Sequence, residues 1–332
     1  MSSAARPAAP LAPALERAAA PEREAAPTRA GPSRLQVIAA FAAIYGFWGG
    51  TFLATRYAVH VVPPLLTIAV RCTGGAVVLG LWLAARGELV RPTAAQWRTA
   101  VVAGALLFLG CHAVMAWAEQ RVTSGQAALY STAIPLWTVA LAAARERRRP
   151  SARVLGGLAL GVAGVAVLAA AGAAGRAAGV VPGRGLALVA GAFCWAAGSL
   201  VARDGARVDS AVQGTAMQLA GGAAVLLLAS AATGELAAWS PASLTARAAA
   251  SLGFLVVCGT VLGFGAYTWL MRVRPPAMVG TYAFVNPVVA VVLAWLAGDE
   301  AASPRTAVAL ALVLGAVVLT WEGARPAPAR RA

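Results

Sequence analysis

One arginine lies inside an otherwise uncharged stretch of the sequence. Arg71 follows the pair Pro63-Pro64 and is the only charged residue between positions 63 and 85. Burying such a side chain in a membrane costs roughly 2.5–3.5 kcal/mol, so it must face the protein interior and find hydrogen-bond acceptors. Arg71 is either tied to carbonyl and hydroxyl groups for structural reasons or offers its charge to an anionic substrate group. His112 lies in a similar stretch, where a neutral, packed imidazole is the simpler interpretation.

A tyrosine–proline pair occurs twice with the same spacing. Tyr130 and Pro135 coincide with Tyr282 and Pro287 when the sequence is shifted by 152 positions, and Asn286 precedes the second proline. A proline inside a helix removes a backbone donor and frees the carbonyl group four residues earlier. Unpaired backbone inside a membrane persists only where protein buries it or where it lines a cavity. The repetition predicts helix breaks at both prolines and favours a cavity over a simple kink.

Two tryptophans stand before runs of small residues. Trp48 is followed by Gly-Gly-Thr51 and Trp195 by Ala-Ala-Gly-Ser199, and a shift of 147 positions superposes the two tryptophans. Small residues allow a neighbouring helix or a ligand to approach the backbone closely. For any single small residue, helix packing is the simpler explanation. The tryptophans lie too deep in their runs for the membrane-interface role that this residue often has, so packing and a binding site both remain open for them.

These residues belong to a chain with the composition of a membrane protein. Apolar residues make up 60% of it, charged residues 12%, and the mean hydropathy is +0.74. These values exclude a soluble domain with a polar surface. Apolar runs of about twenty residues suit helices that cross a hydrocarbon core of about 30 Å, and they are too long for barrel strands. We predict ten transmembrane helices, over residues 35–55, 63–85, 99–118, 125–144, 152–171, 184–202, 211–232, 248–271, 277–297 and 304–322.

The net charge of +15 reports orientation rather than a nucleic-acid partner. With the N-terminus inside, twenty arginines fall in the inner connections and tails, and six fall in the outer connections. This bias predicts that both termini are cytoplasmic. Residues 1–34 and 323–332 are expected to be cytoplasmic tails, and the first of them is expected to be disordered because it has too little apolar surface to fold.

The repeated features divide the chain into two copies of one unit. The shift of 147 positions also matches Arg71 with Gln218, and the shift of 152 matches Trp117 with Trp269. Each copy has five predicted helices, so the second must enter the membrane upside down. Inverted repeats with broken helices at the midplane are typical of alternating-access transporters. We therefore expect an all-α, polytopic membrane protein with two inverted five-helix repeats, at residues 35–171 and 184–322, joined by a linker at 172–183.

The same residues carry a resemblance to a known family. They are Trp48-Gly49, Pro63-Pro64 with Arg71, Trp117 to Pro135, Trp195, and Asn286-Pro287 with Gly298-Asp299-Glu300. The chain resembles, over about residues 37–322, the drug/metabolite transporter superfamily in its ten-helix branch of two EamA domains. The resemblance implies a cytoplasmic-membrane exporter of amino acids or related small metabolites, with a central cavity lined by the first, third, fourth, sixth, eighth and ninth helices. The chain departs from the family pattern after the fourth helix, where Arg148 occupies the position of a glutamate and Glu146 lies two residues earlier.

The predicted substrate-binding residues combine these features, together with Tyr267 from the eighth run. They are Trp48, Thr51, Arg71, His112, Trp117, Tyr130, Trp195, Ser199, Gln218, Tyr267, Tyr282 and Asn286, with helix breaks at Pro135 and Pro287. We expect no catalytic residue, because an enzyme inside the membrane would need several acids, histidines or cysteines that converge, and His112 is the only histidine in a run. The four cysteines have no ligand spacing, so neither a metal nor another cofactor is expected. The expected partners are a small-molecule substrate and the lipid bilayer.

Other functions remain open at this point. A passive channel, a non-transporting membrane sensor and an exporter of drug-like cations are compatible with the same pattern, and so is a homodimer. All twelve acids lie in tails, connections or, for Glu119 and Glu322, at the ends of runs. His112 is then the only candidate for an intramembrane proton relay. The sequence therefore favours substrate exchange or facilitated export over tight proton antiport.

Overall fold

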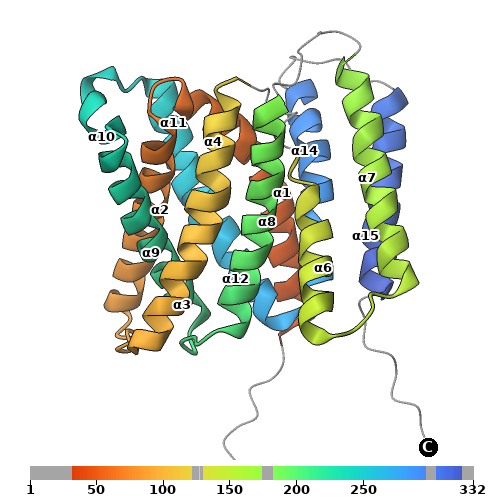
Figure 1. Ribbon diagram of the computed structural model, residues 1–332, viewed down its shortest axis with the longest axis horizontal. Helices are drawn as coiled ribbons and strands as arrows, with labels where there is room; N and C mark the ends of the chain where they lie inside the picture. The colour runs from red at the N-terminus through yellow and green to blue at the C-terminus, as the bar shows by residue number, and fades with distance from the viewer. Residues whose placement is uncertain (1–31, 122–126, 128–129, 174–181, 297–303, 324–332) are drawn as a thin grey trace, which may run out of the picture. The chain divides into compact units, whose positions relative to one another are not determined.

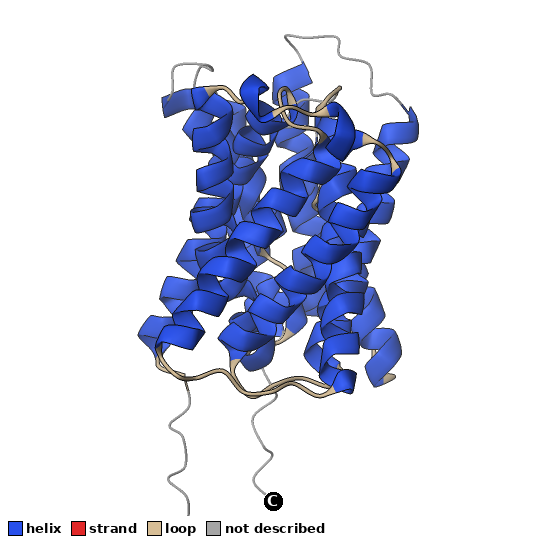
Figure 2. Ribbon diagram, turned by 90° about the vertical axis from the view of Figure 1, so that its left-hand side faces the viewer, coloured by secondary structure: helices blue, strands red, loops and turns tan. Residues whose placement is uncertain are grey.

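The computed structural model describes residues 32–121, 127, 130–173, 182–296 and 304–323. Within these ranges the chain is helical and contains no strand (Figure 2). The predicted tails at 1–34 and 323–332 and the linker at 172–183 lie outside the described residues except at their edges. The compact helical unit begins at Arg34 and is described by itself.

The first half of this unit follows the predicted apolar runs closely. Its helices are α1 (Arg34–Val59), α2 (Pro64–Ala85), α3 (Ala94–Gly104), the π-helical segment η1 (Ala105–Ala113), α4 (Val114–Glu119), α6 (Ala133–Glu146) and α7 (Ala152–Ala173). The segments α3, η1 and α4 form one continuous span. A capping box formed by Thr93 and Gln96 marks its start, because each side chain bonds the other residue's backbone N–H.

The second half repeats this order of elements. It contains α8 (Pro182–Asp204), α9 (Ala211–Ala232), α10 (Glu235–Ala238), the 3₁₀ turn η2 (Pro241–Ser243), α11 (Ala246–Phe254), the π-helical segment η3 (Leu255–Phe264), α12 (Gly265–Val273), α13 (Pro276–Val279), α14 (Tyr282–Leu296) and α15 (Pro304–Gly323). The segments α11, η3 and α12 again form one continuous span. The π-helical segments η1 and η3 therefore occupy corresponding spans of the two halves.

The described part of the chain contains six helical spans long and apolar enough to cross a membrane, and shorter apolar helices accompany them. Large apolar side chains, among them Leu81, Leu228 and Val318, are exposed on the surface of the bundle. Such a surface is stable in lipid, where the helices satisfy their own backbone hydrogen bonds. The described fold is that of an all-helical membrane protein.

Helices of the two halves pack against one another along their lengths. Helix α2 lies along α9, α7 along α15, and α1 along α14, and Figure 1 shows α7 and α15 side by side at one edge of the bundle. The main apolar core joins both halves, since it includes Trp48 and Phe108 from the first and Trp195 and Phe264 from the second. The functional cavities described below lie within this shared interior.

The two prolines predicted to break helices stand after the interruptions rather than within them. Pro135 is the third residue of α6, in the first turn, where its missing N–H would be unpaired in any helix. Pro287 lies inside α14, while the chain turns at Gly280 and Thr281 between α13 and α14. Both interruptions are thus placed a few residues before the proline.

A close crossing of helices depends on Gly104. An alanine methyl group at this position would lie 2.7 Å from the backbone nitrogen of Gly222 and still closer to the carbonyl oxygen of Gln218. Both are backbone atoms of α9 and cannot rotate away. We predict that Gly104→Ala destabilises the fold by about 1–3 kcal/mol, the usual cost of overpacking. The matched control is Gly80→Ala, whose added methyl group meets no atom within 4 Å. Thermal unfolding in detergent should show a lower midpoint for Gly104→Ala alone; equal midpoints would contradict the crossing.

Candidate functional site

Two small cavities lie one above the other inside the bundle. We call them the upper and lower cavity after Figure 1, in which α1 ends at the upper end of the bundle and α8 ends at the lower end. The upper cavity is lined by Trp48, Thr51, Phe52, Thr55, Arg71, Cys111, His112, Met115, Ser131, Ile134, Trp195, Tyr282 and Asn286. The lower cavity is lined by Leu107, Ser199, Ala202, Arg203, Gln218, Tyr267, Thr268, Met271 and Arg272.

Both cavities are contracted in this conformation. The space open to the centres of water molecules is about 40 Å³ in the upper cavity and about 20 Å³ in the lower one. One water molecule needs roughly 10–15 Å³ of such space. The upper cavity therefore has room for about three waters and the lower one for one or two, and neither has room for a metabolite in this conformation.

Arg71 is the charged group of the upper cavity. Its side chain extends from α2 and is only 2% exposed. Its Nε donates to Thr260 Oγ1 at 2.7 Å, and its Nη2 donates to the carbonyl oxygen of Gly259 at 3.3 Å. No carboxylate of the described residues forms an ion pair with it. A guanidinium has five N–H donors, so neutral acceptors position the group while its charge remains uncompensated.

The acceptors of Arg71 come from the π-helical segment η3. A π-helix bonds residues five apart instead of four apart and occurs frequently at functional sites. The carbonyl oxygen of Gly259 accepts from both Arg71 and Trp48, whose Nε1 donates at 2.8 Å. Thr260 in turn donates to the carbonyl oxygen of Leu255 at 2.9 Å. One irregular turn thus fixes a buried arginine of α2 and a buried tryptophan of α1.

His112 likewise contacts a backbone carbonyl group of a π-helical segment, here η1. The Nδ1 atom of His112 lies 3.1 Å from the carbonyl oxygen of Leu107, five residues earlier. Its ring stands 4.9 Å from that of Trp195 and 5.6 Å from that of Phe108. His112 is therefore a packed imidazole with one local backbone partner, at the wall of the upper cavity.

Four aromatic rings form a layer between the two cavities. The ring of Trp48 lies 5.6 Å from Trp195, 5.3 Å from Tyr267 and 4.7 Å from Tyr282. The hydroxyl of Tyr267 forms a 2.6 Å hydrogen bond with Ser199 Oγ on the lower side. We name these four rings the aromatic layer. Its members belong to α1 of the first half and to α8, α12 and α14 of the second half.

Two buried polar atoms that belong to residues of the upper cavity have no hydrogen-bond partner among the described residues. Asn286 is 2% exposed, and its Oδ1 has no hydrogen-bond partner in the described structure. The same is true of the Tyr282 hydroxyl. A buried, unpaired polar group costs about 1–3 kcal/mol. Both residues line the upper cavity, so a ligand or water there could remove that cost.

The structure separates the predicted site residues into three groups. The upper cavity receives Trp48, Thr51, Arg71, His112, Trp195, Tyr282 and Asn286, and the lower cavity receives Ser199, Gln218 and Tyr267. The other two residues line neither cavity. Trp117 is 42% exposed beneath the guanidinium of Arg184, 4.3 Å from its ring centre, and Tyr130 packs beside Phe52 and Leu188. Helical rotation, which depth in the sequence does not fix, explains their placement.

Sequence reasoning missed other lining residues. Phe52 and Thr55 lie one and four residues after the selected Trp48-Thr51 segment, within about one further turn, and an extended helical pattern could have found them. Arg203 and Arg272 were assigned only to the charge bias, yet they line the lower cavity. Glu119, treated as a residue at the end of a run, is 1% exposed with no partner for either oxygen among the described residues. The carboxyl group of Glu119 is therefore a buried titratable group in addition to His112. The expectation that His112 is the only candidate for an intramembrane proton relay loses its premise.

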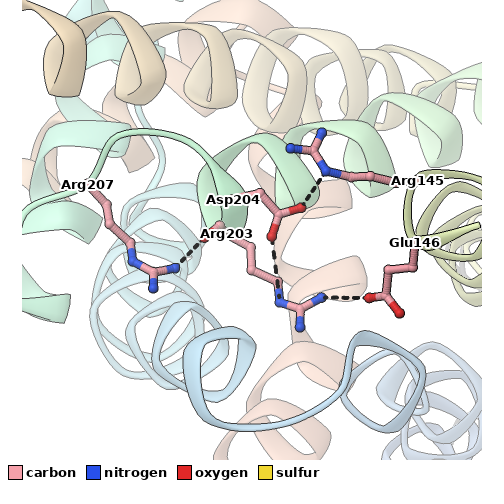
Figure 3. A network of polar contacts seen from close by, with 5 residues as sticks. All are labelled: Arg145, Glu146, Arg203, Asp204 and Arg207. Atoms are coloured by element: carbon pink, nitrogen blue, oxygen red, sulfur yellow. Dashed lines mark hydrogen bonds and ion pairs between the residues drawn. The ribbon is translucent and has the colours of Figure 1, made fainter.

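An ion-pair network lies at the lower end of the bundle (Figure 3). Arg145 pairs with Asp204 at 3.0 Å, while Arg203 lies 4.0 Å from Glu146 and 4.0 Å from Asp204. The network connects the end of α6 to the end of α8, next to the lower cavity that Arg203 lines. Glu146, two residues short of the family's glutamate position, thus contributes to this connection.

Comparisons with known proteins agree with this architecture. The sequence pattern of the EamA-like transporter family matches the chain over residues 35–170 and 184–321. An Escherichia coli K12 protein described as an "uncharacterized inner membrane transporter YedA" is 31% identical over 298 residues, which cover 89% of this chain and 94% of that protein. YedA of Escherichia coli O157:H7 is equally similar. A solved structure described only as "Crystal structure of protein" has a TM-score of 0.70 at 24% identity, over 88% of this chain and 99% of its own, which shows a common fold.

The anchoring of Arg71 can be tested at Thr260. We predict that Thr260→Val, which keeps the shape but removes the acceptor, destabilises the protein by about 1.5–3 kcal/mol, the value of a hydrogen bond to a charged group. Thr260→Ser should restore most of the loss. Thr233→Val, on an exposed residue at the end of α9, is the control. The midpoint of thermal unfolding in detergent measures the effect, and a wild-type midpoint for Thr260→Val would show that Arg71 does not depend on this acceptor.

Proposed function

The chain belongs to the EamA-like transporter family of the drug/metabolite transporter superfamily, and on this premise we propose that it exports amino acids or related small metabolites across the cytoplasmic membrane by alternating access. That it is a membrane transporter of this family follows from the two family matches and from the similarity to YedA. The substrate class, direction and mechanism are our proposal, supported by the cavities.

The observation that carries the proposed substrate class is the uncompensated Arg71 in the upper cavity. A carboxylate of the substrate would provide the charged acceptor that the described residues do not supply, and hydrogen bonds between ionised groups are about twice as strong as neutral ones. The unpaired Oδ1 of Asn286 is an acceptor for an ammonium or hydroxyl group. The faces of Trp48 and Trp195 suit an apolar or aromatic side chain. Together these groups complement a zwitterion with an apolar side chain.

Alternating access is supported by the position of the aromatic layer. It separates the two cavities, and its four rings are contributed by helices from both halves. A transporter must never open both ends at once, so a layer that parts when one half moves against the other suits this requirement. A passive channel needs a continuous path, which a closed layer of packed rings does not provide in this conformation.

We further propose ten membrane crossings arranged as two inverted repeats. In support, α1 and the matching α8 run in opposite directions in Figure 1. The start of α8 is fixed by the bond from Arg184 to the carbonyl oxygen of Trp117 on α4, and its other end, at Gly205, lies beside Thr99 on α3. The arginine bias supports a cytoplasmic location of the lower end and of both termini.

An exporter of drug-like cations is the second candidate, because aromatic faces also bind cations. Arg71 favours the first candidate, since its charge repels a cation in the same cavity.

Transport assays on Arg71→Gln separate these candidates. Gln218 stands at the matching position of the other half, so Arg71→Gln should insert and fold. In proteoliposomes, counterflow of L-phenylalanine should saturate, and the variant should raise its apparent KM by about tenfold or more, as expected from losing a charged hydrogen bond. Uptake of tetraphenylphosphonium should not weaken in parallel. Arg86→Gln, on an exposed residue paired with Glu88, is the control. Equal losses for both substrates would assign Arg71 to structure, and non-saturating flux would indicate a channel.

The topology is tested by labelling in intact cells. In a variant without the native cysteines, Ala177→Cys in the predicted linker should react with a membrane-impermeant maleimide added outside. Pro150→Cys, beside the arginines that follow α6, should react only after permeabilisation. Labelling of Pro150→Cys in intact cells would refute the orientation with cytoplasmic termini.

A further inference from the structure

The lower cavity is the counterpart of the upper one in the duplicated sequence. A shift of 147 positions turns Phe52 and Thr55 of the upper cavity into Ser199 and Ala202 of the lower cavity. The same shift turns Arg71 into Gln218, and a shift of 152 turns Met115 into Tyr267. Corresponding residues on three spans of each half therefore line different cavities, at opposite sides of the aromatic layer. Chance packing defects would not be related by the internal repeat in this way.

The lower cavity contains an unpaired buried acceptor. Gln218 is 7% exposed, and its Oε1 has no hydrogen-bond partner in the described structure. It stands where the other half has Arg71, so the repeat places a polar side chain at each cavity. An amide oxygen without a partner is complementary to an ammonium or hydroxyl group.

Two arginines supply positive charge at the same cavity. Arg272 is positioned by backbone carbonyl groups, since it donates to Val208 at 3.2 Å, Asp209 at 2.8 Å and Ser210 at 3.4 Å. Within the described part of the chain, the Arg203 guanidinium has two ion pairs of 4.0 Å, to Glu146 and Asp204, which Figure 3 shows. Partly exposed pairs of this kind contribute about 0–1 kcal/mol. Arg203 can therefore exchange these partners for another anion at low cost.

This cavity is separated from the upper site. The hydrogen bond between Tyr267 and Ser199 closes its upper side, beneath the rings of Trp48 and Trp195. Arg71 lines the upper cavity and does not line the lower one. A molecule in the lower cavity would meet Arg203, Arg272 and Gln218, and would not meet Arg71.

We propose that the lower cavity is a second binding site, which takes the carboxylate of a zwitterion between Arg203 and Arg272 and its ammonium group at Gln218 before the molecule passes the aromatic layer. The identity of the ligand rests on the proposed function, whereas the preference for an anionic group follows from the lining alone. Transport then proceeds through two successive sites, related by the internal repeat, each with its own positive charge.

Cysteine chemistry at Ala202 tests the charge preference without a known substrate. The full-length Ala202→Cys variant, with the native cysteines replaced, is purified in detergent and treated with two methanethiosulfonates, one carrying a sulfonate and one a trimethylammonium group. After correction for their rates with a free thiol, the anionic reagent should react about tenfold faster, the lower end of electrostatic concentration effects. Arg272→Gln should reduce this ratio severalfold. Arg274→Gln, which removes the same charge two residues later but outside the lining, should leave it nearly unchanged.

A matched position shows whether the effect is local. Thr55→Cys marks the upper cavity, and Arg272→Gln should not change its reagent preference. A cysteine at 202 that neither reagent reaches, that shows no preference, or that loses its preference equally with Arg274→Gln would overturn the proposal.

Protection experiments identify the ligand chemistry. L-phenylalanine should slow labelling of Ala202→Cys more than benzoate, and benzoate more than phenethylamine, because the site is complementary to both charges but dominated by the arginines. Gln218→Leu should abolish the advantage of L-phenylalanine over benzoate. Protection led by phenethylamine would overturn the proposal. If L-phenylalanine showed no counterflow while Ala202→Cys still preferred the anionic reagent, the proposed transport function would be rejected and the anion site would be retained.

Discussion

The carbonyl group of Gly259 organises the upper cavity. It lies in the π-helical segment η3 and accepts hydrogen bonds from Trp48 and Arg71. A carbonyl oxygen has two lone pairs, so it can accept from side chains in addition to its own helix. This carbonyl and the hydroxyl of Thr260 therefore hold a buried positive charge without an acidic partner among the described residues. That charge is what distinguishes this cavity from an ordinary packing defect.

Most of the fold could be predicted because the bilayer imposes simple lengths. The predicted run 211–232, for example, coincides with α9 at Ala211–Ala232, whereas the run 277–297 is divided into α13 and α14 and the described helix α6 begins only at Ala133. The site was less predictable, because sequence position gives depth along a helix but not its rotation. Trp48 and Arg71 line a cavity, whereas Trp117 turned outward to Arg184. The π-helical segments left no reliable signal, since their apolar residues and glycines suit an α-helix equally well.

The division of one expected cavity into two has a physical cause. Four large rings that meet at 4.7–5.8 Å pack between the residues that line the upper cavity and those that line the lower one. All four rings belong to residues that the sequence predicted to bind substrate. The sequence could not separate the two roles, because an aromatic residue deep in an apolar run looks the same whether it contacts a ligand or another ring. In this conformation the four aromatic rings pack against one another in edge-to-face and tilted contacts. The same faces become available to a ligand only when the helices that carry them separate.

At the lower end of the bundle, the ion pairs of Arg203 offer a way to couple opening to the binding of a ligand. At the lower end, the pairs of Arg203 with Glu146 and Asp204 are long and partly exposed, so breaking them costs little. Under the proposed second site, an anion would replace these carboxylates as the partner of Arg203 and remove its contact with Glu146 of α6, whereas the 3.0 Å pair of Arg145 with Asp204 would still join α6 to α8. A ligand shifts a conformational equilibrium only by its difference in affinity for the two states. Arg203 would provide such a difference if it bound the ligand more fully after releasing Glu146. The charge proposed to select an anion at the lower cavity is therefore also part of the contact between α6 and α8.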